Sequence, residues 1–149
     1  METDRYLAGQ SPPLVQRKGK TMTNQKRETL FGEANEISQP LDETVLRIRL
    51  LNDDLRTRRL DGIVVITDGI AALGPSTIRD IISAITVFDG FTPENDPYGE
   101  HDCAVMAVSA IKIIWKIDYY DLTRQYHSSD PSDRNVTSRV MTVMRADEY

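Results

Sequence analysis

Two polar segments hold the residues of this 149-residue chain whose types and spacing could do chemistry, NDPYGEHD at 95–102 and WKIDYYD at 115–121. Their carboxylates and single imidazole suit hard divalent cations such as Mg²⁺ or Mn²⁺, and a lysine beside them could stabilise a developing phosphoryl charge. The candidate site residues are Asp96, Tyr98, Glu100, His101, Asp102, Lys116, Asp118, Tyr120 and Asp121.

A β-hairpin is predicted to bring these two segments together. The apolar runs at 103–108 and 111–119 are typical of antiparallel strands, and the short turn at 109–110 would join them. In such a ladder the numbers of directly opposed residues share one sum, here 219, so His101 would face Asp118. Opposed side chains project from the same face, with their Cβ atoms about 5 Å apart.

The alternation of side chains along the second strand sorts its two faces. Trp115 and Tyr119 fall on one side with the isoleucines, whereas Lys116, Asp118 and Tyr120 fall on the other side. We therefore expect the polar cluster on the less apolar face, at the open end of the hairpin. Tyr120 is the better aromatic candidate for recognition, because its ring belongs to this polar face.

Three interpretations of the cluster are open. A metal-dependent hydrolase or nuclease would use Glu100, His101, Asp102 and Asp118 to hold Mg²⁺ or Mn²⁺. A binding protein without a cofactor would present the same acids to a protein partner. In a purely structural interpretation, Asp96 and Asp102 cap backbone amides of their own loop. Acidic residues beside turns are common, so we favour a non-enzymatic protein over the hydrolase.

Other site chemistry is disfavoured by the residue counts. One cysteine excludes an internal disulfide, and two histidines with that cysteine lack the close spacing of a structural zinc site. Cys103 is expected to be a small buried hydrophobe of its strand and not a nucleophile.

The charge pattern divides the chain in two. Residues 1–30 carry six Lys/Arg against three Asp/Glu, and the remainder carries twelve against twenty, which together give the net charge of −5. An acidic body disfavours binding to a nucleic-acid backbone and favours a protein partner. No apolar run approaches the ~20 residues of a membrane span, and no signal-peptide pattern is present, so we expect a cytoplasmic protein.

The elements that must position the candidate site point to one α+β domain at 39–149, preceded by a loosely attached tail at 1–38. Whether translation starts at Met1 or at Met22 is left open by the sequence. Helices are expected over 40–58 and 75–88 from their apolar stripes. Residues 136–146 favour a third helix capped by Asp133, although their β-branched content leaves a strand open. The predicted fold is a small antiparallel sheet, with strands near 63–67, 103–108 and 111–119, packed by about three helices.

Several segments of the chain also resemble a family of small bacterial proteins that is catalogued only as a domain of unknown function. The resemblance covers about 42–149 and rests on LNDDLR (51–56), GIVVITDGIAALG (62–74), GEHD (99–102), WKIDYYD (115–121) and SSDPSD (128–133). It implies no activity and no catalytic residues. Family members are most common in alphaproteobacteria, often on plasmids and other mobile elements, and this setting suggests a counter-defence role such as antirestriction.

Overall fold

The computed structural model describes residues 40–149. The predicted tail, its basic residues and the alternative start at Met22 lie outside this part of the chain. No helix within 40–149 is both long enough and apolar enough to cross a membrane.

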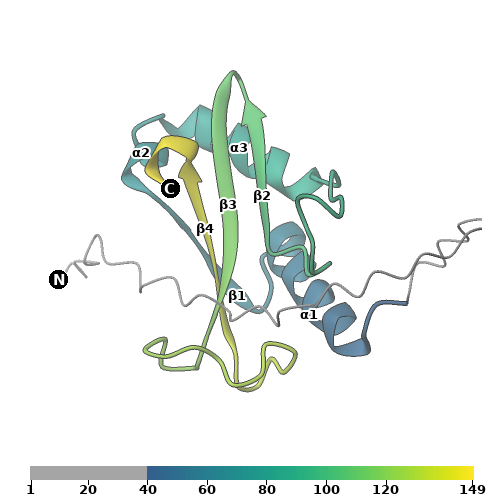
Figure 1. Cartoon of the computed structure of the whole chain (residues 1–149). Helices are drawn as coiled ribbons and strands as arrows, with labels where there is room; N and C mark the ends of the chain where they lie inside the picture. The colour runs from purple at the N-terminus through teal and green to yellow at the C-terminus, as the bar shows by residue number, and fades with distance from the viewer. Residues whose placement is uncertain (1–39) are drawn as a thin grey trace, which may run out of the picture. The chain divides into compact units, whose positions relative to one another are not determined.

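A four-stranded mixed sheet forms the centre of the fold, and its strands lie in the order β1-β4-β3-β2 (Figure 1). The strands are β1 (Gly62–Ile66), β2 (Cys103–Val108), β3 (Ile111–Tyr120) and β4 (Ser138–Arg145). β4 pairs in parallel with β1, whereas β3 pairs antiparallel with both β2 and β4. The α+β class is therefore confirmed, with a sheet that is mixed and not purely antiparallel.

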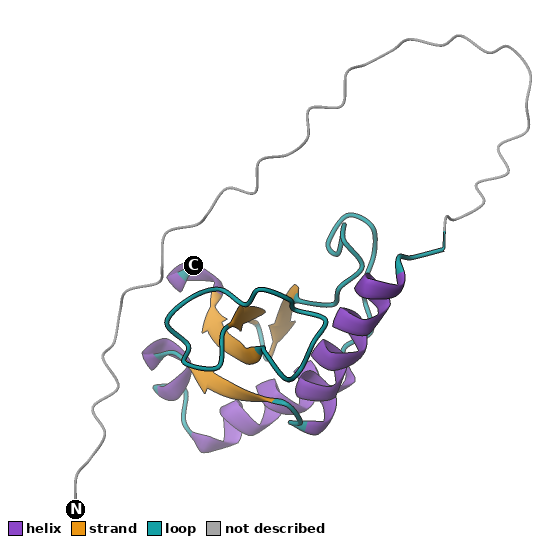
Figure 2. Ribbon diagram, turned by 90° about the horizontal axis from the view of Figure 1, so that it is seen from below, coloured by secondary structure: helices purple, strands orange, loops and turns teal. Residues whose placement is uncertain are grey.

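The helices gather on one side of this sheet (Figure 2). They are α1 (Glu43–Asp53), its continuation as a π-helical turn η1 (Asp54–Arg58), α2 (Asp68–Ala71) and α3 (Pro75–Val87). The final 3₁₀ turn η2 (Ala146–Glu148) follows β4 and lies apart from α1 and α3. Asp42 caps α1, because its carboxylate accepts a hydrogen bond from the amide of Thr44 at 2.7 Å. Pro75 occupies the first turn of α3, where its missing N–H costs nothing.

The core lies between the helices and the inner face of the sheet. Its centre is Trp115 of β3, which is fully buried and packs edge-on against Phe88 and Phe91. Residues alternate along β3, so those at odd positions from 111 to 119 face the helices. The predicted apolar face of this strand is confirmed.

The predicted helix at 136–146 is wrong, because these residues form β4. β4 is a central strand with a neighbour on each side, and its four hydrophobic residues are divided between the two faces of the sheet: Met141 and Val143 face the helices, whereas Val140 and Met144 face the other side. A strand with apolar side chains on both faces loses the strict alternation that identifies strands in sequence. Asp133 caps no helix, and its carboxylate instead accepts from the amide of Asn135 at 2.8 Å.

The hairpin has the predicted register. Cys103 pairs with Lys116, and Val108 pairs with Ile111, so the sum of 219 holds along the whole of β2. The turn between the strands has both Ser109 and Ala110 in the left-handed region, with φ values of 49° and 64°. These are the signs of a type I′ turn, which normally contains Asn-Gly.

Candidate functional site

His101 leaves the hairpin just before the ladder begins. The backbone still pairs at Asp102, whose carbonyl accepts from the amide of Ile117 at 2.7 Å. His101 then takes a positive φ of 54°, and its ring lies on the helix side of the sheet, stacked on Phe91 with the ring centroids 3.7 Å apart. The predicted pairing of His101 with Asp118 is therefore wrong.

The partner of His101 is Asp53, at the end of α1. The His101 Nδ1 atom lies 3.0 and 3.1 Å from the two carboxylate oxygens of Asp53, so that nitrogen carries the proton and donates it. On the other side of the ring, Nε2 lies 3.7 Å from a carboxylate oxygen of Asp96. The imidazole is thus held between two acids and a phenyl ring.

Asp96 organises the loop that carries His101. One of its carboxylate oxygens accepts from the amides of Glu100 and His101, at 3.0 and 3.2 Å, and the side chain is buried. This is the amide capping that the structural interpretation predicted for Asp96. The carboxylate is thereby occupied by its own loop.

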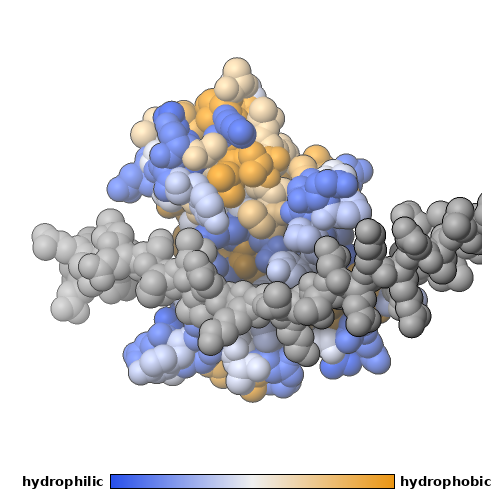
Figure 3. Space-filling model, viewed as in Figure 1, coloured by the Kyte–Doolittle hydropathy of each residue, from blue (hydrophilic) through white to orange (hydrophobic). Residues whose placement is uncertain are grey.

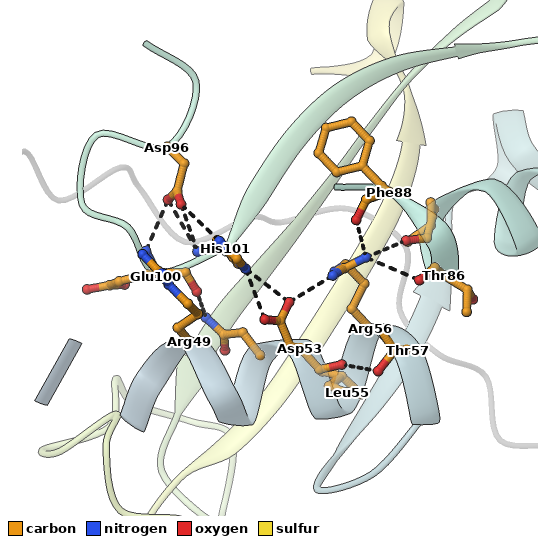
Figure 4. A network of polar contacts seen from close by, with 12 residues as sticks. Arg49, Asp53, Leu55, Arg56, Thr57, Thr86, Phe88, Asp96, Glu100 and His101 are labelled. Atoms are coloured by element: carbon orange, nitrogen blue, oxygen red, sulfur yellow. Dashed lines mark hydrogen bonds and ion pairs between the residues drawn. The ribbon is translucent and has the colours of Figure 1, made fainter. Parts of the chain in front are cut away.

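Arg56 continues this line of contacts into α3 (Figure 4). Its guanidinium bonds to Asp53 at 2.8 Å and donates to the carbonyl oxygens of Ile85 and Phe88, both at 2.8 Å. Those carbonyls lie at the C-terminal end of α3, where no following turn of helix supplies N–H donors to them. Arg56 is 5% exposed, so its hydrogen bonds connect the end of α1 to the end of α3 in the interior of the protein.

The π-helical turn explains how Arg56 becomes buried. Its wider hydrogen bonding adds a residue to the turn, so that Leu55 and Arg56 both face inward, at 0% and 5% exposure. The guanidinium then lies over the rings of Phe91 and Trp115, with its carbon 5.4 and 5.8 Å from their centroids. These distances fit cation–π attraction in a site shielded from water.

A second polar group surrounds Asn52 and is completely buried at its centre. The Asn52 amide donates to the carbonyl of Glu100 at 2.9 Å and to the hydroxyl of Tyr119 at 2.7 Å. Its oxygen accepts from Nε of Arg139 at 3.0 Å, and the Tyr119 hydroxyl donates to the Glu100 carboxylate at 3.1 Å. Asn52 and Arg139 are both 0% exposed. Burial raises the pKa of Tyr119 far above its ordinary value, so its hydroxyl stays a donor.

The remaining candidates lie elsewhere. Lys116 and Asp118 form an ion pair of 3.0 Å on the opposite face of the sheet, beside Tyr120. Tyr98 is 60% exposed in the loop before β2, and Asp102 is half-buried where the ladder starts.

Asp121 holds the loop that follows β3. Burial alone would raise the pKa of Asp121, but hydrogen bonds from Thr123 and from the amides of Gln125 and Tyr126 lower it. This acid stabilises the turn after the strand.

The nine candidates therefore do not form one cluster. Asp96, Glu100 and His101 join the helix-side network, whereas Lys116, Asp118 and Tyr120 lie on the other face. Within residues 40–149, no group of three or more His, Cys, Asp or Glu side chains is arranged to hold a metal ion. The four ligands named for a metal site are accordingly divided between the two faces.

Sequence reasoning missed five residues of the network: Asn52, Asp53, Arg56, Tyr119 and Arg139. The sequence did contain a signal for two of them, Asn52 and Arg56. Asn52 and Arg56 are one helical turn apart and directly follow Leu51 and Leu55 of the buried stripe, which is an unusual place for polar side chains. Arg139 carried no such signal, because its strand had been expected to be a helix.

Cys103 lies on the face opposite the helices and is half-buried. Burial, followed by the nearby charge of Asp102, raises the pKa of its thiol to about 11. A neutral thiol is a poor nucleophile, which agrees with the expectation that Cys103 is a small hydrophobe of the strand.

Comparison with known proteins gives one match. A family model described as "Protein of unknown function (DUF3768)" matches residues 66–148, which is more than half of the chain. No curated protein and no solved structure matches.

Proposed function

Because the chain belongs to this family of proteins of unknown function, its role must be inferred from its own residues, and we propose that it is a binding or regulatory protein. Its working surface is the open sheet face, which is the side of the sheet turned away from α1 and α3. The open sheet face comprises Val105, Ile114, Lys116, Asp118, Tyr120, Val140, Thr142 and Met144.

The observation that carries this proposal is the contrast between the two faces. On the helix side, the side chains of Asp96, Glu100 and His101 all bond within the fold, so they serve its stability. On the open sheet face, α1 and α3 leave the strands uncovered, and hydrophobic residues gather over the upper part of β2, β3 and β4 (Figure 3). An apolar centre with polar groups around it is typical of protein interfaces.

The polar end of this face supplies a rigid aromatic anchor. The ring of Tyr120 stacks in parallel on His127, with the centroids 6.3 Å apart and the planes within 6°. Burial and the charge of Asp118 raise the pKa of Tyr120, so its hydroxyl remains a donor at neutral pH. Tyr120 is stacked on His127 and lies beside the Lys116–Asp118 ion pair. Tyrosines are among the residues that contribute most of the binding energy in protein interfaces.

The size of the surface also suits a protein partner. With strands about 4.8 Å apart and about 3.3 Å per residue, a four-stranded face eight residues long covers roughly 500 Å². A standard interface uses about 800 Å² per partner. The neighbouring loop at 121–137 offers Leu122 and Tyr126, which are 63% and 72% exposed, and these extend the surface.

The location and the biological setting are part of the same proposal. The protein acts in the cytoplasm. Its partner belongs to a host defence system, as is suggested by the mobile-element setting of the family that this chain resembles.

Site-specific photocrosslinking in cells of the natural host tests this proposal. A photoreactive amino acid is placed at Tyr120 on the open sheet face or, as the matched control, at Arg79 on the exposed side of α3. We expect a discrete covalent adduct with another protein from position 120 and none from position 79. The Asp118→Lys variant, carrying the same probe at position 120, should weaken the adduct. Equal adducts from both positions, or none from position 120, would refute the proposal.

A further inference from the structure

β2 is an edge strand whose outer backbone groups have no partner in the described fold. The carbonyl of Asp102 points to β3, and N–H and C=O groups alternate in direction along an antiparallel strand. The N–H and C=O groups of Cys103, Val105 and Ala107 therefore point away from the sheet. No hydrogen bond joins them to any other residue of 40–149.

This edge lacks the features that usually prevent strands of different molecules from pairing. β2 reads CAVMAV, so it contains no charged residue and no proline, and its pairing with β3 runs without a bulge. Val105, at the middle of the strand, is 50% exposed. An uncharged exposed edge with a half-exposed valine at its centre is a template for another strand.

The opposite edge of the sheet is different. β1 begins at Gly62, and the loop after β3 lies beside it, since Leu122 and Arg134 line the same shallow pocket as Gly62. Arg134 also forms an ion pair of 3.1 Å with Asp61, just before the strand. Charged residues and a loop thus stand at the start of the β1 edge.

We propose that β2 pairs with β2 of a second copy of this chain, antiparallel and centred on Val105. The strand is its own complement in this arrangement. Val105 faces Val105 of the partner subunit, and Cys103 and Ala107 face each other across the two-fold axis. Each of these three residue pairs closes two hydrogen bonds through groups that otherwise have no partner.

The second copy fits this edge better than a foreign strand for two reasons. Pairing β2 with itself opposes only small or apolar side chains, so no like charges meet across the axis. Positive φ values at His101 and Ser109, on either side of the strand, also limit both copies to the same short length. The symmetric interface is of the closed two-fold kind that most homodimers use.

The pairing would join the two sheets into one of eight strands. Because the two-fold axis is perpendicular to the sheet, both open faces would lie on the same side of it. The inference does not rest on the proposed function, which is tested at Tyr120 and Asp118, on a different strand.

Measurement of molar mass by light scattering over a range of protein concentrations tests the dimer. We expect the full chain to shift from the monomer mass to twice that mass as concentration rises. Val105→Lys should weaken dimerisation at least tenfold, because it places two like charges opposite each other. Val87→Lys, at a 77% exposed position of α3, is the matched control and should dimerise like the parent. Ala107→Lys is a second disrupting variant, should Val105→Lys fold poorly.

A monomer at every concentration would overturn the inference, and so would a dimer that Val105→Lys and Ala107→Lys leave intact. Disulfide trapping tests the register. In a chain with Cys103→Ser, Val105→Cys should form an intermolecular disulfide under mild oxidation, since paired Cα atoms would lie about 5.5 Å apart. Val87→Cys in the same background should form far less. Equal disulfide formation by both variants would overturn the pairing at Val105.

Discussion

Buried polar residues stabilise this fold through the geometry of their hydrogen bonds and not through charge alone. Asn52 shows this best, because one amide group meets a carbonyl, a hydroxyl and a guanidinium that come from three different segments of the chain. An apolar residue of similar size would fill the space but satisfy none of these groups. Unsatisfied buried groups cost more than satisfied ones contribute, so the side chain holds its neighbours in one arrangement.

Asn52→Leu should therefore destabilise the fold strongly. The change removes the donor to the Glu100 carbonyl and to the Tyr119 hydroxyl, and it leaves the buried Nε of Arg139 without its acceptor. We expect the free energy of unfolding to fall by about 3 kcal/mol, the range for breaking a buried charged network. Urea denaturation followed by circular dichroism measures it. The exposed change Gln125→Ala should alter the same quantity by less than about 0.5 kcal/mol. Similar values for both variants would show that the network contributes little.

Contacts between elements decide where the loop before β2 lies. The end of α1 supplies Asp53 and, through its π-helical turn, Arg56, and these two residues connect the loop to the end of α3. Sequence periodicity finds α1 and α3 separately but cannot show that a residue of one meets the carbonyls of the other. The hairpin is a local element, and for that reason its register followed correctly from the numbering.

The turn of the β2–β3 hairpin has a backbone conformation that is unfavourable for its two residues, and substitution can relieve this strain. Ser109 and Ala110 both have positive φ, a conformation that is uncommon for residues with a Cβ and easy for Asn-Gly. The double substitution Ser109→Asn with Ala110→Gly should raise the free energy of unfolding by about 1 kcal/mol. Thermal denaturation measures the change. Ala110→Val should lower the same quantity, because β-branched residues avoid this region. If both variants shift the melting temperature in one direction, the turn is not of the type described.

The molecule as a whole has one continuous core in its described part. Leu55 of η1, Ile70 of α2, Ile81 and Ile85 of α3 and Trp115 of β3 belong to a single buried cluster. The helix-side network lies directly beside this cluster, since Arg56 contacts the ring of Trp115. A fold built on one core should unfold in one step.

Trp115 is the only tryptophan of the chain and is fully buried, so its fluorescence reports the state of the core. In urea, the fluorescence transition and the far-ultraviolet circular dichroism transition should have the same midpoint and slope within error. The reason is that strands and helices share the cluster around this one ring. A fluorescence change that precedes the loss of secondary structure would show that the core and the sheet unfold separately.

The sequence alone determined the features that depend on neighbours along the chain. Periodicity located α1 and α3, β-branched runs located β1 and β2, and the short turn set the register of β2 with β3. The α+β class followed from these elements.

Only the tertiary structure decided which face each candidate residue serves. A single positive φ at His101 moves its ring from the face of Asp118 to that of Asp53, which is 48 positions away in the sequence. The strand at 138–145 was hidden because it has apolar side chains on both faces, and its strand partners lie more than 15 residues away in the sequence. Backbone dihedrals at one residue and contacts between distant segments leave no period in a sequence. The two polar segments at 95–102 and 115–121 were predicted to form one site. In the structure, the first stabilises the fold on the helix side of the sheet, and the polar residues of the second lie on the opposite face.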